Sequence, residues 1–173
     1  MVNNIYTIRD IIALAGGKIT GRKKIQKMIY ILEQIVGVFD KPHQFRWNYY
    51  GVFSEELASE LNLGEAFGVL KENEQQEYGY RTYHIEAVYP DSNNPAYPKK
   101  DTLPIGLIKY LNAKEPRELE IISSIIYFEN QGLNEHEIKE RLYTFKSHLE
   151  NFFEQGFKAY DEIKQATQRD GLR

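Results

Sequence analysis

The stretch GRKKIQKMIYILEQ, residues 21–34, decides the fold, because it carries the clearest helical pattern in the chain. Apolar residues recur from here onward at the 3.6-residue period of an α-helix. They are Ile25, Met28, Ile29, Leu32, Ile35 and Val36. Gly37 and Pro42 end the pattern. We therefore expect a long core helix that begins with Thr20 as its N-cap.

Four cations occupy the first turns of this helix, namely Arg22, Lys23, Lys24 and Lys27. The free amide groups at a helix start are partly positive, so each exposed cation there costs about 0.3–1 kcal/mol. Three explanations stay open. The cations could be solvated with their stems over apolar neighbours, they could pair with acids of residues 55–77, or they could bind an anionic group of a protein or nucleic acid.

Length and composition indicate an ordinary globular protein, expected to form one compact domain overall. The chain has 173 residues, 42% of them hydrophobic and 27% charged, and it contains no cysteine for a disulfide or a thiolate zinc site. No apolar run reaches the roughly 20 residues that span a bilayer, and no signal peptide is recognisable. We expect a cytoplasmic protein without membrane contact.

Charge is distributed unevenly along the chain, whose net charge is -3. Residues 1–50 contain eight Lys/Arg against three Asp/Glu, whereas residues 51–103 contain four against ten. This asymmetry permits an electrostatic partner at the N-terminal end. The acidic total makes the chain a poor general binder of nucleic acid.

The order of expected elements predicts a mainly α (α+β) fold. Residues 1–90 are expected to hold two helices, the first capped by Thr7, then an aromatic strand over residues 45–51, a helix capped by Ser54, and a β-hairpin turning near residues 72–76. Residues 91–104 are a proline-rich loop, and residues 105–173 are a helical half that closes with one long helix from residue 146. This order predicts a winged-helix-like N-terminal half packed against a helical C-terminal half.

The sequence contains no recognisable catalytic motif, which points away from an enzyme. The four histidines are scattered without paired metal-ligand spacing, and no phosphate loop or nucleophile motif is present. The run NEHEIKE, residues 134–140, is better interpreted as a solvated helix face than as a metal site, because adjacent helical residues point in different directions. We predict no catalytic residues, no metal and no cofactor.

The aromatic segment RWNYYG, residues 46–51, is a second candidate contact region. Trp47 and one tyrosine could pack in the core. Alternatively, Tyr49 or Tyr50 could form part of an exposed aromatic contact surface.

Several motifs together resemble a known family. The basic helix 21–34 is followed by YYGVFSEELASELNLGEAFGVL, then by EPRELEIISSIIYF and YTFKSHL. In this order they are similar to the YwgA-like proteins and, more distantly, to Panacea/SocA-like antitoxin domains. Where those families read YGPYS, this chain reads Tyr50-Gly51-Val52-Phe53-Ser54 and lacks the proline.

The resemblance implies a small bacterial or phage protein that acts by binding, and in the Panacea branch the role is neutralising a toxin. We predict a non-enzymatic interaction protein, antitoxin-like or regulatory, acting through protein–protein contacts; the alternative is a winged-helix-type DNA-binding regulator. A protein partner, such as a toxin, is favoured over nucleic acid, and self-association stays open. The predicted contact residues are Arg22, Lys23, Lys24, Lys27, Tyr49, Tyr50, Phe53 and Ser54.

Overall fold

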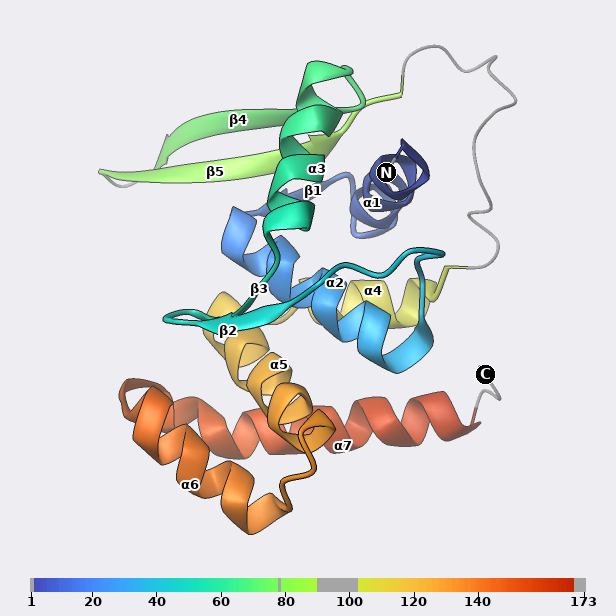
Figure 1. Cartoon of the computed structure of the whole chain (residues 1–173). Coiled ribbons are helices and arrows are strands. Elements are labelled where there is room, and N and C mark those ends of the chain that lie inside the picture. The colour runs from blue at the N-terminus through green and yellow to red at the C-terminus, as the bar shows by residue number, and fades with distance from the viewer. Residues whose placement is uncertain (1, 78, 90–102, 170–173) are drawn as a thin grey trace.

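The computed structural model describes residues 2–77, 79–89 and 103–169, and it confirms a mainly α (α+β) fold (Figure 1). The N-terminal half contains α1 (Val2–Leu14), β1 (Lys18–Thr20), α2 (Arg22–Val36), β2 (Arg46–Asn48), β3 (Gly51–Phe53), α3 (Glu55–Ala66), β4 (Leu70–Glu77) and β5 (Tyr80–Ala87). The C-terminal half contains α4 (Ile105–Asn112), α5 (Pro116–Asn130), α6 (Glu135–Lys146), the 3-10 helix η2 (Ser147–Phe152) and α7 (Phe153–Arg169).

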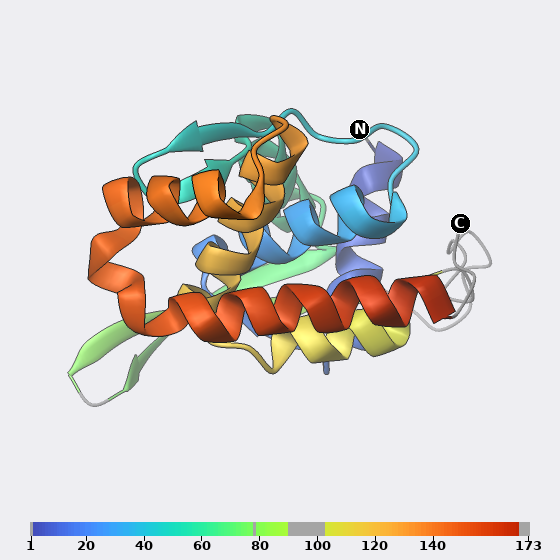
Figure 2. The same cartoon turned by 90° about the horizontal axis from the view of Figure 1, so that it is seen from below.

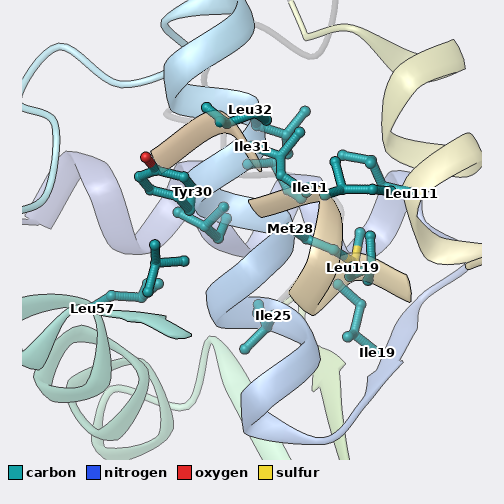
Figure 3. Packing of buried hydrophobic residues seen from close by; sticks show 14 of the residues in the cluster. Ile11, Ile19, Ile25, Met28, Tyr30, Ile31, Leu32, Leu57, Leu111 and Leu119 are labelled. Carbon is teal, nitrogen blue, oxygen red and sulfur yellow. The ribbon is translucent and has the colours of Figure 1, made fainter. Parts of the chain in front are cut away.

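Helix α2 lies at the centre of the core. Its residues Ile25, Met28 and Leu32 are fully buried, as the apolar period predicted. Figure 3 shows side chains from neighbouring elements packed around them. These neighbours are Ile11 of α1, Ile19 of β1, Leu57 of α3, Leu111 of α4 and Leu119 of α5. Because elements surround α2 on several sides, its polar residues Gln26, Lys27 and Glu33 are buried as well.

Two antiparallel sheets form within the described residues. In the larger one the strand order is β1-β5-β4, with Ile19 opposite Ile85 and Leu70 opposite Ala87. The smaller one is the hairpin β2–β3, in which Trp47 pairs with Val52. The β4–β5 hairpin extends from the side of the molecule, whereas β2–β3 lies across the middle, above α5 in Figure 1.

Helix α5 packs against both α2 and α7, and α4 also contacts α2 directly. Pro116 occupies the first turn of α5, and Asn134 caps α6 in a capping box with Glu137. Gly156 of α7 packs tightly on Ile121 of α5. In Figure 2 helices α4 and α7 run alongside each other, and the Tyr110 hydroxyl of α4 donates to Glu162 of α7 at 2.6 Å.

Two predictions about the first helices are wrong. Thr7 does not cap α1, which begins at Val2 because Ile5 also packs in the core; the Thr7 hydroxyl donates to the Asn3 carbonyl within the helix. Thr20 does not cap α2. It belongs to the short strand β1 and contacts His84, while Gly21 at φ 90° precedes the helix.

Three later predictions also need correction. The single strand expected over residues 45–51 is a hairpin of two short strands, with Tyr49 and Tyr50 between them. The second hairpin turns beyond Glu77 rather than near residues 72–76, because the β4–β5 pairing continues to Glu77 and Tyr80. The long closing helix is interrupted by η2, where Leu149 leaves helical geometry at φ -111°. The predicted loop over residues 91–104 falls mostly outside the described residues.

Candidate functional site

The β2–β3 hairpin is the centre of the candidate site, because it holds the predicted contact residues Tyr49 and Tyr50 at its turn. The Asn48 side-chain oxygen accepts from the Tyr50 amide at 3.0 Å, which closes the turn locally. Gly51 then takes φ 81°, a conformation that side-chain-bearing residues rarely adopt. The two tyrosine rings contact edge to face, with centroids 5.0 Å apart.

Two buried polar side chains of α2 bind backbone groups of β3 and of Ser54, the residue that follows it. The Gln26 amide donates to the Ser54 carbonyl and accepts from the Ser54 amide, both at 2.9 Å. The Lys27 ammonium donates to the Val52 carbonyl of β3 at 2.5 Å. These side chains satisfy backbone groups that β3 leaves without a strand partner.

A second buried lysine holds the turn itself. Lys146, at the end of α6, is 1% exposed and donates to the Tyr49 carbonyl at 2.9 Å and to the Glu120 carboxylate of α5 at 2.6 Å. Its ammonium also lies 5.3 Å from the Trp47 ring centroid. The hairpin is thus fixed by charged side chains from α2 and α6, with Glu120 as the counter-charge.

Burial and like charges change the acidity of this cluster. Desolvation lowers the pKa of Lys27 to about 8; the carboxylate of Glu120 opposes this shift, while the ammonium groups of Lys146 and Lys23 add to it. Gly51 lies close to the same groups, since a Cβ placed there would be 3.7 Å from Glu120 and 3.9 Å from the Lys27 ammonium. The cluster therefore combines two buried cations with one carboxylate.

The tyrosines that this cluster positions are open to solvent. Tyr49 is 84% exposed and Tyr50 is 49% exposed, while Trp47 on β2 is half-buried against Tyr127 and Phe128. The sequence left open whether one of the two tyrosines packs in the core. Both are exposed instead, whereas Trp47 packs against the core. The exposed Lys23 ammonium lies 3.4 Å from the Tyr50 ring centroid, a cation–π contact.

The four cations of α2 have four different environments. Arg22 pairs with Glu72 of β4, its Nε at 2.9 Å and its Nη2 at 2.5 Å from the carboxylate, and also donates to Asn62. Lys24 donates to the Asn112 carbonyl at 2.5 Å. Internal pairing with an acid of residues 55–77 thus occurs for Arg22, while Lys24 and Lys27 use carbonyl groups and Lys23 uses the Tyr50 ring.

The remaining predicted contact residues lie beneath the surface. Ser54 is fully buried and caps α3 by accepting from the Leu57 amide at 3.2 Å, as the sequence predicted. Phe53 is half-buried beside it. Sequence reasoning missed Gln26, Glu120 and Lys146. The last two belong to the EPRELE and YTFKSHL motifs, whose match to the family was the available signal.

A separate buried cluster surrounds His43. Its ring nitrogens contact Glu33 of α2 and, at 2.7 Å, Glu60 of α3. The Asn4 side chain donates to Glu60 at 3.2 Å. Desolvation lowers the pKa of His43, but the hydrogen bonds from its ring to the two carboxylates outweigh this effect, so the pKa is raised overall. This cluster joins α1, α2 and α3 inside the molecule and does not reach the hairpin's tyrosines.

Among the described residues no group of three or more His, Cys, Asp or Glu side chains is arranged to hold a metal ion. In residues 2–77, 79–89 and 103–169, no helix combines the length and apolar character needed to cross a membrane.

The site and fold define a class of mainly α (α+β) protein in which buried lysines support an aromatic hairpin. Over 154 residues the chain is 32% identical to a protein of Bacillus subtilis (strain 168) that bears the name uncharacterized protein YwgA; the match covers 87% of this chain and 90% of that relative. The chain belongs to the YwgA family. No family model matches it, and no solved structure matches it significantly.

Proposed function

We propose that the chain is a non-enzymatic interaction protein, a regulatory or antitoxin-like module that binds a protein partner through the β2–β3 hairpin. The proposal rests on one observation, which is that buried charged side chains hold an exposed turn in place. Lys27 and Lys146 both donate to hairpin carbonyls, and the turn presents Tyr49 at 84% exposure. Tyrosines that are already fixed before binding lose less conformational entropy when the partner binds. The free-energy cost of forming the interface is therefore lower.

Tyrosine is suited to this role, because it offers a large contact area and a polar end while losing little rotamer freedom. The neighbouring charge of Lys23 gives the surface a cationic edge. We define the contact surface as Lys23, Tyr49 and Tyr50. In this proposal Lys27, Phe53 and Ser54 support the surface from below, while Arg22 and Lys24 keep their internal partners.

The experiment is affinity capture of the tagged chain from a lysate of its own host. Wild type is compared with Lys23→Glu and with Lys158→Glu, a matched charge reversal at an exposed position of α7. We expect a protein that is recovered with wild type and Lys158→Glu and depleted with Lys23→Glu. Equal recovery of that protein with all three chains would contradict the assignment of Lys23 to the contact surface.

The antitoxin-like form of the proposal is tested by co-expressing the chain with the product of the neighbouring gene. Rescue of growth is the expected result.

The alternative, a winged-helix-type DNA-binding regulator, is supported by one observation. The order β1-β5-β4, with α2 and α3 between β1 and β4, is the order expected of a winged-helix domain. The helix that would enter the DNA groove is then α3. It contains no Lys or Arg and exposes Glu55, Glu56 and Glu65. Those carboxylates would repel phosphates, so we favour a protein partner.

A DNA titration at two salt concentrations separates the two proposals. A DNA-binding regulator that contacts several phosphates loses affinity steeply as salt rises. We expect no salt-sensitive DNA binding by this chain. Tight binding that weakens strongly with salt would favour the regulator instead.

A further inference from the structure

A pocket opens beside Tyr50, between α2, the β2–β3 hairpin and α3. Its volume is about 170 Å³. Its walls include the Tyr50 and Phe53 side chains of the hairpin, and Ala58 and Leu61 of α3 close its apolar side. Lys27, which is 3% exposed, forms part of the polar side.

The size of the pocket limits what can enter it. A cavity of about 150 Å³ accommodates benzene, whereas sites for drug-sized ligands and cofactors occupy roughly 300–1,000 Å³. The pocket is therefore of the right size for one ring-sized group and too small for a nucleotide. Central pockets that receive a single side chain are typical of the points where protein interfaces gain most of their affinity.

The charge around the pocket favours a negative partner. Its lining includes Arg22, Lys23 and Lys27, and none of the described residues that line it is acidic. Glu72 balances Arg22, whereas Lys23 contacts the Tyr50 ring. A carboxylate approaching the mouth of the pocket would meet Lys23, which is exposed.

We propose that this pocket receives one apolar or aromatic side chain from an acidic segment of a protein partner, with a flanking carboxylate of that segment bound by Lys23. This inference rests on the proposed function and specifies the chemistry of the partner. The apolar walls select the side chain that enters, and the cationic mouth selects the charge beside it. Tyr50 belongs to both the pocket and the contact surface, so it joins the two.

The test uses the full chain and three capped peptides, Ac-Glu-Phe-Glu-NH2, Ac-Glu-Ala-Glu-NH2 and Ac-Lys-Phe-Lys-NH2, followed by backbone amide shifts in NMR. We expect saturable shifts at Lys23, Gln26 and Tyr50 with the first peptide only. Lys23→Gln should weaken that binding about 2- to 5-fold, as expected for an exposed ion pair. Lys158→Gln is the matched control and should bind like wild type.

Ala58→Phe fills the pocket and should abolish the shifts, with its amide spectrum checking that the fold is retained. Equal binding of the basic and acidic peptides would overturn the proposal, as would an absence of saturable shifts up to the solubility of Ac-Glu-Phe-Glu-NH2. If partner capture requires Lys23 but is unchanged in Ala58→Phe, the pocket proposal fails and the proposed function stands. If capture is also insensitive to Lys23→Glu, the proposed function itself fails.

Discussion

Lys27 and Lys146 lie beneath the same β-hairpin, where the first donates to the Val52 carbonyl at 2.5 Å and the second to the Tyr49 carbonyl at 2.9 Å. They come from α2 and α6, in opposite halves of the chain. Like charges so close together are unfavourable, and Glu120 compensates for them only in part. The cluster is therefore expected to be sensitive both to substitution and to pH.

Removing the Lys146 ammonium should destabilise the protein strongly. Lys146→Met leaves the Glu120 carboxylate without its ion-pair partner and the Tyr49 carbonyl without its donor, at an expected cost of about 3–5 kcal/mol in the free energy of unfolding. Lys146→Met combined with Glu120→Gln should cost less than Lys146→Met alone, because the double substitution also removes the carboxylate that Lys146→Met leaves without its ion-pair partner. Urea unfolding followed by circular dichroism measures both, with the exposed Lys158→Met as control. A loss below about 1 kcal/mol for Lys146→Met would contradict this account of the cluster.

Because of Lys27, the free energy of unfolding should rise with pH in the alkaline range. Its pKa is about 8 when folded and about 10.4 when unfolded, so the unfolded chain binds more protons between these values. The free energy of unfolding of wild type should therefore increase relative to Lys27→Met from about pH 8 to about pH 10. Urea titrations across this range check the prediction. Parallel pH dependence of the two proteins would contradict it.

The contribution of His43 to the free energy of unfolding should instead fall as the pH rises. Its contacts with Glu33 and Glu60 raise its pKa in the folded state above the unfolded value of about 6.5. The stabilising contribution of protonated His43 is therefore complete below about pH 6.5 and is lost as the pH rises through the folded value. The difference in unfolding free energy between wild type and His43→Gln should shrink accordingly. His136→Gln, which removes a histidine at an exposed position outside this cluster, is the control.

Two glycines should respond to alanine in opposite ways. A Cβ at Gly156 would lie 2.5 Å from Ile121 Cγ2 and 3.1 Å from Ile121 Cβ, so Gly156→Ala must separate α7 from α5 and should cost about 1–3 kcal/mol. Gly106 in α4 has open space around it, and Gly106→Ala should stabilise by about 0.5–1 kcal/mol through helix propensity. Thermal unfolding of both variants is the measurement. Stabilisation by both substitutions would contradict the tight α7–α5 contact, because helix propensity would then outweigh it at Gly156.

The sequence predicted the features that depend on local pattern. The apolar period of α2 and the Ser54 cap are confirmed, because each is determined by a few neighbouring residues. β1 was not predicted, because neighbouring residues alone do not determine it. It has three residues and depends on pairing with β5, which lies far along the chain.

The candidate site was predictable only in part. Tyr49, Tyr50 and Lys23 were expected as contact residues and are exposed. Lys27 looked like part of a charged helix edge, yet it is buried, because the hairpin and α5 cover that face of α2. Periodicity cannot reveal that a polar face is covered by other polar groups. Lys146 and Glu120 meet only in the folded chain, as do His43, Glu33 and Glu60.

The central claim is that the β2–β3 hairpin binds a protein partner, and one measurement tests it most directly. The protein recovered by affinity capture is purified and titrated calorimetrically with wild type, with Tyr49→Ala/Tyr50→Ala, and with Tyr80→Ala, which removes an exposed tyrosine from β5. We predict that the double substitution weakens binding by at least about tenfold, as for a buried interface anchor, while Tyr80→Ala binds like wild type. Equal affinity of all three proteins would contradict the claim.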